Sequence, residues 1–157
     1  MAQICDRLGE GQVVNIDLDP ERSDKSHNHQ FAFVRTAWMN LPEYHLGTTY
    51  AVSTTTLRKY ALIQTGHCKT SMIAVGNNDR AERVAAFIDD LARDKHEFAV
   101  TSVSGSVVSC HTPLSQSKAA MGGEVFQRSK QDILEYLADM IGVTADELAK
   151  MGKKGET

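Results

Sequence analysis

Short apolar and alternating runs along the chain predict four β-strands. Apolar and polar residues alternate over Gln12–Leu18, and a compact apolar run occupies Ser71–Val75. Two further β-rich runs, Glu97–Val103 and Val107–His111, flank the turn residues Ser104-Gly105-Ser106. A turn that contains glycine between two such runs is typical of a β-hairpin.

A stripe of large apolar residues predicts the first helix, which ends near Pro42. The stripe recurs at three- and four-residue steps and consists of Phe31, Val34, Trp38 and Leu41. Because these residues share one helical face, we expect Trp38 and Phe31 to lie in the core. The alternative is that both rings are exposed platforms on which bases stack. The polar segment Glu21–Asn28 ahead of the stripe is expected to be a loop or a helix entry.

The same spacing predicts two helices in the middle of the chain. The first contains Leu57–Gln64, follows the N-cap candidates Ser53–Thr56 and ends at Gly66. The second is capped by Asn77-Asn78-Asp79. Its inward-facing residues are expected to be Val84, Phe87, Ile88 and Leu91.

Two helices are predicted near the C-terminal end. The longer one carries a single apolar stripe, formed by Phe126, Ile133, Leu137 and Ile141. A short terminal helix follows, because Thr144 and Glu147 have the spacing of a capping box.

The order of these elements favours the α+β class over a regular alternation of strands and helices. We expect a small mixed or antiparallel sheet with a hairpin, packed against about four helices. A length of 157 residues suits one domain. We therefore expect a single globular domain over residues 1–150 and a flexible tail over residues 151–157.

Charge and cysteine content limit the classes of function. The formal net charge is −3, which excludes a broadly basic nucleic-acid coat but allows a local basic patch. Cys5, Cys68 and Cys110 lack C-x-x-C spacing, which fits a reducing compartment better than a disulfide framework. The first residues lack the apolar core of a secretion signal, and no apolar run is long enough to span a membrane. A cytoplasmic protein is expected.

Two segments are candidates for phosphate contact. The first runs from Arg22 to Arg35 and places cations and histidines next to a predicted helix start, where backbone N–H groups favour anions. The second, Ser115–Lys118, offers hydroxyls, one amide and a lysine ahead of a helix. The alternative for the first segment is a solvated polar loop with a capped helix, and for the second a flexible connection. The expected nucleic-acid-binding residues, including two cations between these segments, are Arg22, Lys25, His27, His29, Arg35, Arg58, Lys59, Ser117 and Lys118.

The sequence carries no strong signal for a metal site or for catalysis. The pairs His67-Cys68 and Cys110-His111 contain zinc-ligand types, but adjacent residues in an extended chain point to opposite faces. We expect Cys68 and Cys110 to be small buried residues instead. Neither a nucleophile elbow nor a phosphate-binding loop of the G-x-x-x-x-G-K-[ST] type is present. No metal, cofactor or catalytic residue is therefore expected.

Two stretches resemble the phage Orf (NinB) recombination-mediator family. One is Arg22-Ser23 with the following polar run and Phe31-Ala32-Phe33-Val34. The other leads from Val107-Val108-Ser109 through Ser115-Gln116-Ser117-Lys118 and Met121 to Glu124-Val125-Phe126. The resemblance implies an α+β homodimer that binds single-stranded DNA and a single-strand-binding protein and helps to load a recombinase.

Three functions remain open at this point. The first is a phage or prophage accessory protein that binds single-stranded DNA without a chemical step, with the DNA phosphates held by the cations named above. The second is a protein-only interaction module that inhibits or modulates a host factor, which would suit the net acidity. The third is a metal-dependent nuclease, which would need two or three converging carboxylates.

Overall fold

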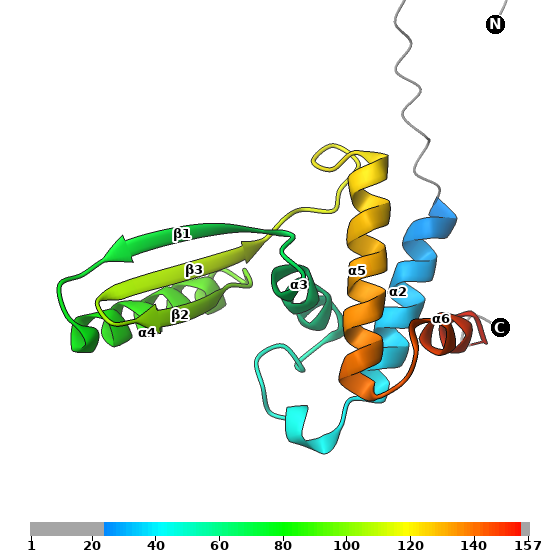
Figure 1. Cartoon of the computed structure of the whole chain (residues 1–157), viewed down its shortest axis with the longest axis horizontal. Coiled ribbons are helices and arrows are strands. Elements are labelled where there is room, and N and C mark those ends of the chain that lie inside the picture. Colours follow the sequence, from blue (N-terminus) through cyan, green and yellow to red (C-terminus); the bar gives the residue numbers. More distant parts are fainter. Residues whose placement is uncertain (1–23, 155–157) are drawn as a thin grey trace, which may run out of the picture.

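The computed structural model describes residues 24–154, and these form a helical body and a sheet arm (Figure 1). The helical body contains α2 (Asp24–Met39), α3 (Thr54–Gln64), α5 (Gly123–Ile141) and α6 (Ala145–Lys154), with the short 3-10 helix η1 (Glu43–His45) between α2 and α3. The sheet arm contains β1 (Cys68–Ala74), α4 (Asn78–Asp94), β2 (Val100–Ser104) and β3 (Val107–Pro113). The predicted α+β class is confirmed, and the sheet is wholly antiparallel. The strand predicted at Gln12–Leu18 and the residue Arg22 lie outside the described residues.

The helical body holds the larger hydrophobic core. Leu57, Leu62, Ile133, Leu137 and Leu148 are fully or almost fully buried there, together with residues of α2. Gly152 lets α6 approach α2 closely, because a Cβ atom at this position would lie 3.0 Å from the backbone nitrogen of Phe33. The helix α6 continues to Lys154, so residues 151–154 of the predicted tail are helical.

The buried face of α2 differs from the predicted stripe. Gln30, Phe33, Val34 and Ala37 are buried, whereas Phe31 is 51% exposed and Trp38 is 37% exposed. The prediction that Phe31 and Trp38 belong to the core is therefore wrong. The buried positions have helical spacing, but they include a glutamine and a small alanine, which a search for large apolar residues passes over. Of the two alternatives for Glu21–Asn28, a loop or a helix entry, residues 24–28 adopt the second, because α2 begins at Asp24.

Local capping signals in α3 and α6 are confirmed. The Ser53 side chain accepts a hydrogen bond from the backbone of Thr56, and the Thr56 hydroxyl in turn accepts one from the backbone of Ser53. Thr144 and Glu147 exchange the corresponding bonds at the start of α6. These bonds satisfy backbone N–H groups that have no partner within the helix.

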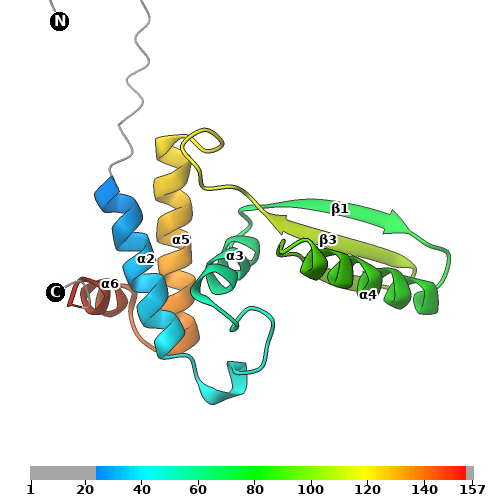
Figure 2. The same ribbon diagram turned by 180° about the vertical axis from the view of Figure 1, so that it is seen from behind.

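The sheet arm is built from three antiparallel strands in the order β1-β3-β2, with α4 against one face (Figure 2). The predicted hairpin joins β2 to β3, and Gly105 takes a positive φ of 57° in its turn. Ala81, Ala85 and Val108 form the small buried cluster between α4 and the sheet. Among the described residues, no helix is long and apolar enough to cross a membrane.

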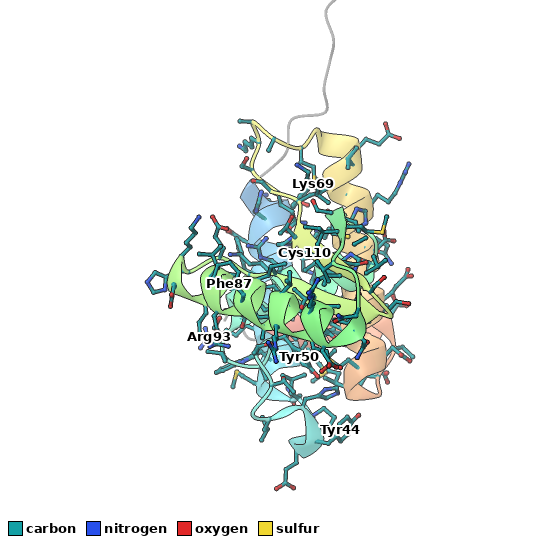
Figure 3. All side chains as sticks on the ribbon, turned by 90° about the vertical axis from the view of Figure 1, so that its left-hand side faces the viewer. Tyr44, Tyr50, Lys69, Phe87, Arg93 and Cys110 are labelled. Carbon is teal, nitrogen blue, oxygen red and sulfur yellow. The ribbon has the colours of Figure 1, made fainter. Side chains whose placement is uncertain are left out.

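Two of the four residues predicted to face inward from α4 are exposed. Val84 and Ile88 pack on the small cluster, but Phe87 is 65% exposed and Leu91 is 42% exposed. Figure 3 looks at the arm with α4 in front and labels Phe87 there. The sheet has only three short strands, so it covers the face of α4 defined by Ala81, Ala85 and Ile88 and leaves the flank with Phe87 in solvent.

Candidate functional site

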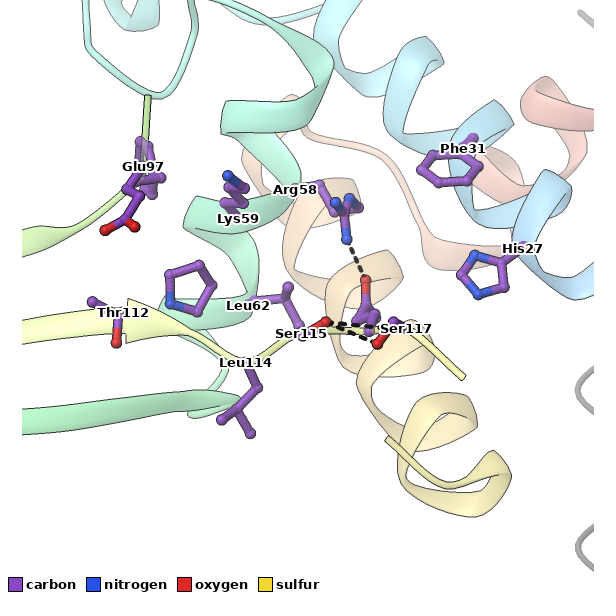
Figure 4. A pocket seen from close by; sticks show the side chains of 13 residues that line it. His27, Phe31, Arg58, Lys59, Leu62, Glu97, Thr112, Leu114, Ser115 and Ser117 are labelled. Carbon is purple, nitrogen blue, oxygen red and sulfur yellow. Dashed lines mark hydrogen bonds between the residues drawn. The ribbon is translucent and has the colours of Figure 1, made fainter. Parts of the chain in front are cut away.

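A pocket of about 430 Å³ lies where the helical body meets the sheet arm (Figure 4). Its walls are formed by α2, by α3 and by the end of β3 with the loop that follows it. Glu97 and Phe98, which precede β2, close one side. Four of the predicted site residues line it. They are His27 from α2, Arg58 and Lys59 from α3, and Ser117 from the loop 114–122.

Arg58 is the central cation of the pocket. Its Nη1 donates a hydrogen bond to Oε1 of Gln116 at 2.7 Å, and its guanidinium lies 5.7 Å from the ring centroid of Phe31. Burial lowers the pKa of Arg58 from its ordinary value, yet an arginine stays protonated in proteins. No carboxylate of residues 24–154 forms an ion pair with it. Its positive charge is thus held by a neutral amide and is not neutralised by the described part of the chain.

Gln116 is fixed by buried hydrogen bonds that join the loop 114–122 to α2 and α5. Gln30 Nε2 donates to Gln116 Oε1 at 2.7 Å, and Gln116 Nε2 donates to Gln30 Oε1 at 3.2 Å. Gln116 Nε2 also donates to the hydroxyl of Ser129 in α5 at 2.8 Å. Because an unsatisfied buried amide is costly, these bonds hold Gln116, and through it Arg58, in one position.

Aromatic rings form the α2 side of the pocket. His27 stacks on Phe126 with ring centroids 4.6 Å apart, which orients its imidazole toward the pocket. Phe31 lies one helical turn further along α2, and half of its surface is exposed. An exposed aromatic face beside a fixed guanidinium is an arrangement on which a planar ring can stack.

The opposite side of the pocket carries hydroxyl groups and charges of both signs among apolar residues. Ser115 Oγ donates to Ser117 Oγ at 3.1 Å and accepts from the backbone N–H of Ser117 at 3.3 Å, which shapes the loop (Figure 4). Lys59 adds a second cation, and Glu97 contributes a carboxylate on the far side of the pocket from His27. The two cations outnumber the carboxylate, so the pocket favours an anion.

The other predicted site residues within residues 24–154 do not line this pocket. Lys25 and Lys118 are exposed outside it, and His29 packs edge-on against Phe33 at 5.6 Å. Arg35 lines a separate hollow of about 440 Å³ beside Gly152. The described part of this segment, residues 24–35, is therefore not gathered into one anion site.

Sequence reasoning counted Gln116 only as part of the candidate phosphate loop, did not place Gln30 or Ser129 among the binding residues, and placed Phe31 in the core. Gln30 and Ser129 are polar residues on otherwise apolar helical faces, and that pattern is a signal for a buried hydrogen-bond network. Nothing in the sequence pairs them with Gln116, since 86 residues separate Gln30 from Gln116.

The His–Cys pairs have other partners in the structure. His67 Nε2 lies 2.6 Å from a carboxylate oxygen of Asp132, and His111 Nδ1 lies 2.9 Å from the Thr70 hydroxyl. Cys68 and Cys110 are half-buried, not buried as expected. Burial and the nearby Asp89 raise the pKa of the Cys110 thiol. Within residues 24–154, no group of three or more His, Cys, Asp or Glu could hold a metal ion.

A second hollow, of about 670 Å³, lies on the other side of α3 and shares Glu97 and Phe98 with the pocket. Tyr50 and Tyr60 line it and are stacked, with ring centroids 4.0 Å apart. The hollow and the pocket thus share a wall at Glu97 and Phe98.

A scan of family models found no match to the chain, and searches of curated proteins and of solved structures found none either. The site geometry and the resemblance noted in the sequence are therefore the grounds for a functional proposal.

Proposed function

We propose that the pocket binds single-stranded DNA through its phosphate backbone and that the chain is a phage or prophage recombination accessory protein. The observation that carries the proposal is the fixed, half-buried guanidinium of Arg58, which has a neutral hydrogen-bond partner and no carboxylate partner among the described residues. A charge held in this way gains stability when an external anion approaches.

The other groups in the pocket suit a nucleic-acid strand better than an isolated anion. Lys59 provides a second phosphate contact beside Arg58, and Ser117 adds a hydroxyl. Phe31 presents an exposed ring next to Arg58 on which a base can stack. Stacking of this kind needs unpaired bases, so single strands are favoured over duplex. The proposal involves no chemical step.

The resemblance to the Orf family supports the same function and adds partners. A protein of that kind contacts a single-strand-binding protein or a recombinase and acts as a homodimer. Exposed Phe87 and Leu91 on α4 give a separate surface that a protein partner could cover. If the chain bound no DNA, this surface would favour the protein-only interaction module.

The proposal is tested with a double variant that removes both pocket cations, Arg58→Gln with Lys59→Ala. Binding of a labelled single-stranded oligonucleotide is measured by anisotropy at several salt concentrations. Phosphate contacts release counterions, so each lost contact flattens the log–log salt dependence by about 0.7. The double variant is expected to bind more weakly to every sequence, with a slope reduced by about 1.4.

A matched control removes the same charge elsewhere. Arg83 in α4 and Lys150 in α6 are both exposed and lie outside the pocket. The variant Arg83→Gln with Lys150→Ala should bind like the parent chain. Equal weakening by both double variants would show that overall charge and not the pocket attracts DNA. Unchanged binding by a folded pocket variant would place the interface elsewhere.

A further inference from the structure

The outer edge of β1 has no strand beside it within residues 24–154. Six of its seven residues are exposed, and Met72 and Ile73 are 73% and 52% exposed. Figures 1 and 2 show no described element beside this edge, and α4 packs against β2 and β3. The strand contains no proline and no bulge, and Lys69 is its only charge. Apart from Lys69, it therefore lacks the features that usually keep an edge strand from pairing with another strand.

The direction of the backbone groups of β1 follows from its hydrogen bonds to the neighbouring chain. The His67 carbonyl accepts from the N–H of Leu114, and the N–H of Val75 donates to the Ser106 carbonyl. In an antiparallel pair, every second residue bonds to the partner strand. The backbone N–H and C=O groups of the odd-numbered residues of β1 thus point toward β3. The N–H and C=O groups of Cys68, Thr70, Met72 and Ala74 point to the open edge.

We propose that β1 pairs with β1 of a second copy of this chain, antiparallel, about a two-fold axis at Ser71. This register sets Cys68 opposite Ala74 and Thr70 opposite Met72 of the second copy. All the outward backbone groups of both strands then find hydrogen-bond partners. The two-fold makes the contact closed, so pairing stops at two copies.

Side chains agree with this register. Lys69, the only charged residue of the strand, lies opposite Ile73 of the second copy, and the two lysines are kept well apart. Met72 gains a neighbour in Thr70 on the sheet face away from α4. The two three-stranded sheets become one continuous sheet with both copies of α4 on the same face. This inference does not depend on DNA binding.

Cysteine cross-linking tests the register directly. In a chain with Cys5, Cys68 and Cys110 replaced by serine, Ser71→Cys places two thiols opposite each other across the axis. Residues in such a non-hydrogen-bonded pair have Cα atoms about 4.5 Å apart, within the range of a disulfide. Mild oxidation is expected to give a covalent dimer on a non-reducing gel.

The neighbouring positions supply the matched controls. Lys69→Cys alone and Ile73→Cys alone should not cross-link, because each is far from its own copy. A mixture of the two variants should cross-link, because residues 69 and 73 lie opposite each other in the dimer. Cross-linking of Ser71→Cys no faster than that of Lys69→Cys would overturn the proposal.

A second measurement does not depend on cysteine chemistry. The N–H of Thr70 points outward, so Thr70→Pro removes a donor from the open edge and leaves the backbone hydrogen bonds to β3 intact, while the bond between the Thr70 hydroxyl and His111 is lost. Sedimentation should show that the parent chain is a dimer and that the folded proline variant is a monomer. A monomeric parent at tens of micromolar, or a dimer that survives Thr70→Pro, would show that β1 does not pair with itself.

Discussion

The helical body and the sheet arm are similar in their share of secondary structure but differ in how much core each holds. The core cluster of the helical body contains eleven buried residues, and the cluster under α4 contains three, two of them alanines. Large apolar residues that the arm does carry, such as Phe87 and Met72, are mostly exposed. Most of the stabilising burial is thus in the helical body, and the sheet arm leaves apolar side chains exposed to solvent.

This difference explains where interactions with partners are expected. A protein of this size needs one well-packed core to fold, and the body provides it. The arm leaves a strand edge and an apolar flank of α4 uncovered, and such surfaces are typical of contact sites. The candidate DNA pocket lies at the junction, with its cations and aromatic rings on the body and part of its wall on the arm.

Truncation of large side chains should distinguish the two regions most strongly. Leu137 is fully buried in the body, so Leu137→Ala is expected to lower the free energy of unfolding by about 2–5 kcal/mol. Phe87 lies in solvent on the arm, and Phe87→Ala should change it by only about 0.5 kcal/mol. Urea unfolding of both variants measures these changes. Similar losses would show that the arm carries as much of the core as the body.

A smaller effect is expected from the addition of one methyl group to the body. Gly152→Ala forces a Cβ atom against the backbone of α2 at Phe33, which α6 can relieve only by moving away. We expect a loss of about 1–3 kcal/mol in the free energy of unfolding. Lys153→Ala is the control, since this side chain is exposed. If Gly152→Ala were as stable as this control, the close contact between α2 and α6 would be disproved.

Elements defined by short-range signals could be predicted from the sequence. The cap at Ser53, the capping box of Thr144 and Glu147 and the hairpin around Gly105 all depend on residues only a few positions apart. The buried face of α2 could not, because it depends on which helices cover it. Gln30 is buried there by a loop that comes 86 residues later.

The site was predictable only in part, for the same reason. Arg58, Lys59 and Ser117 are candidates by residue type, but their meeting in one pocket depends on contacts between distant segments. Arg35 is an arginine like Arg58 and belongs to the same predicted segment as His27, yet it lines a different hollow. Charge identifies candidates, and packing decides which of them act together.

The most direct test of the central claim is the salt dependence of single-stranded DNA binding by the parent chain. A labelled oligothymidine is titrated with the protein at a series of salt concentrations, with a duplex of equal length for comparison. If Arg58 and Lys59 both contact phosphates, a plot of the logarithm of the binding constant against the logarithm of salt concentration should have a slope of about −1.4 or steeper. The single strand should bind more tightly than the duplex. No binding at low salt, or equal binding of both DNA forms, would contradict the account.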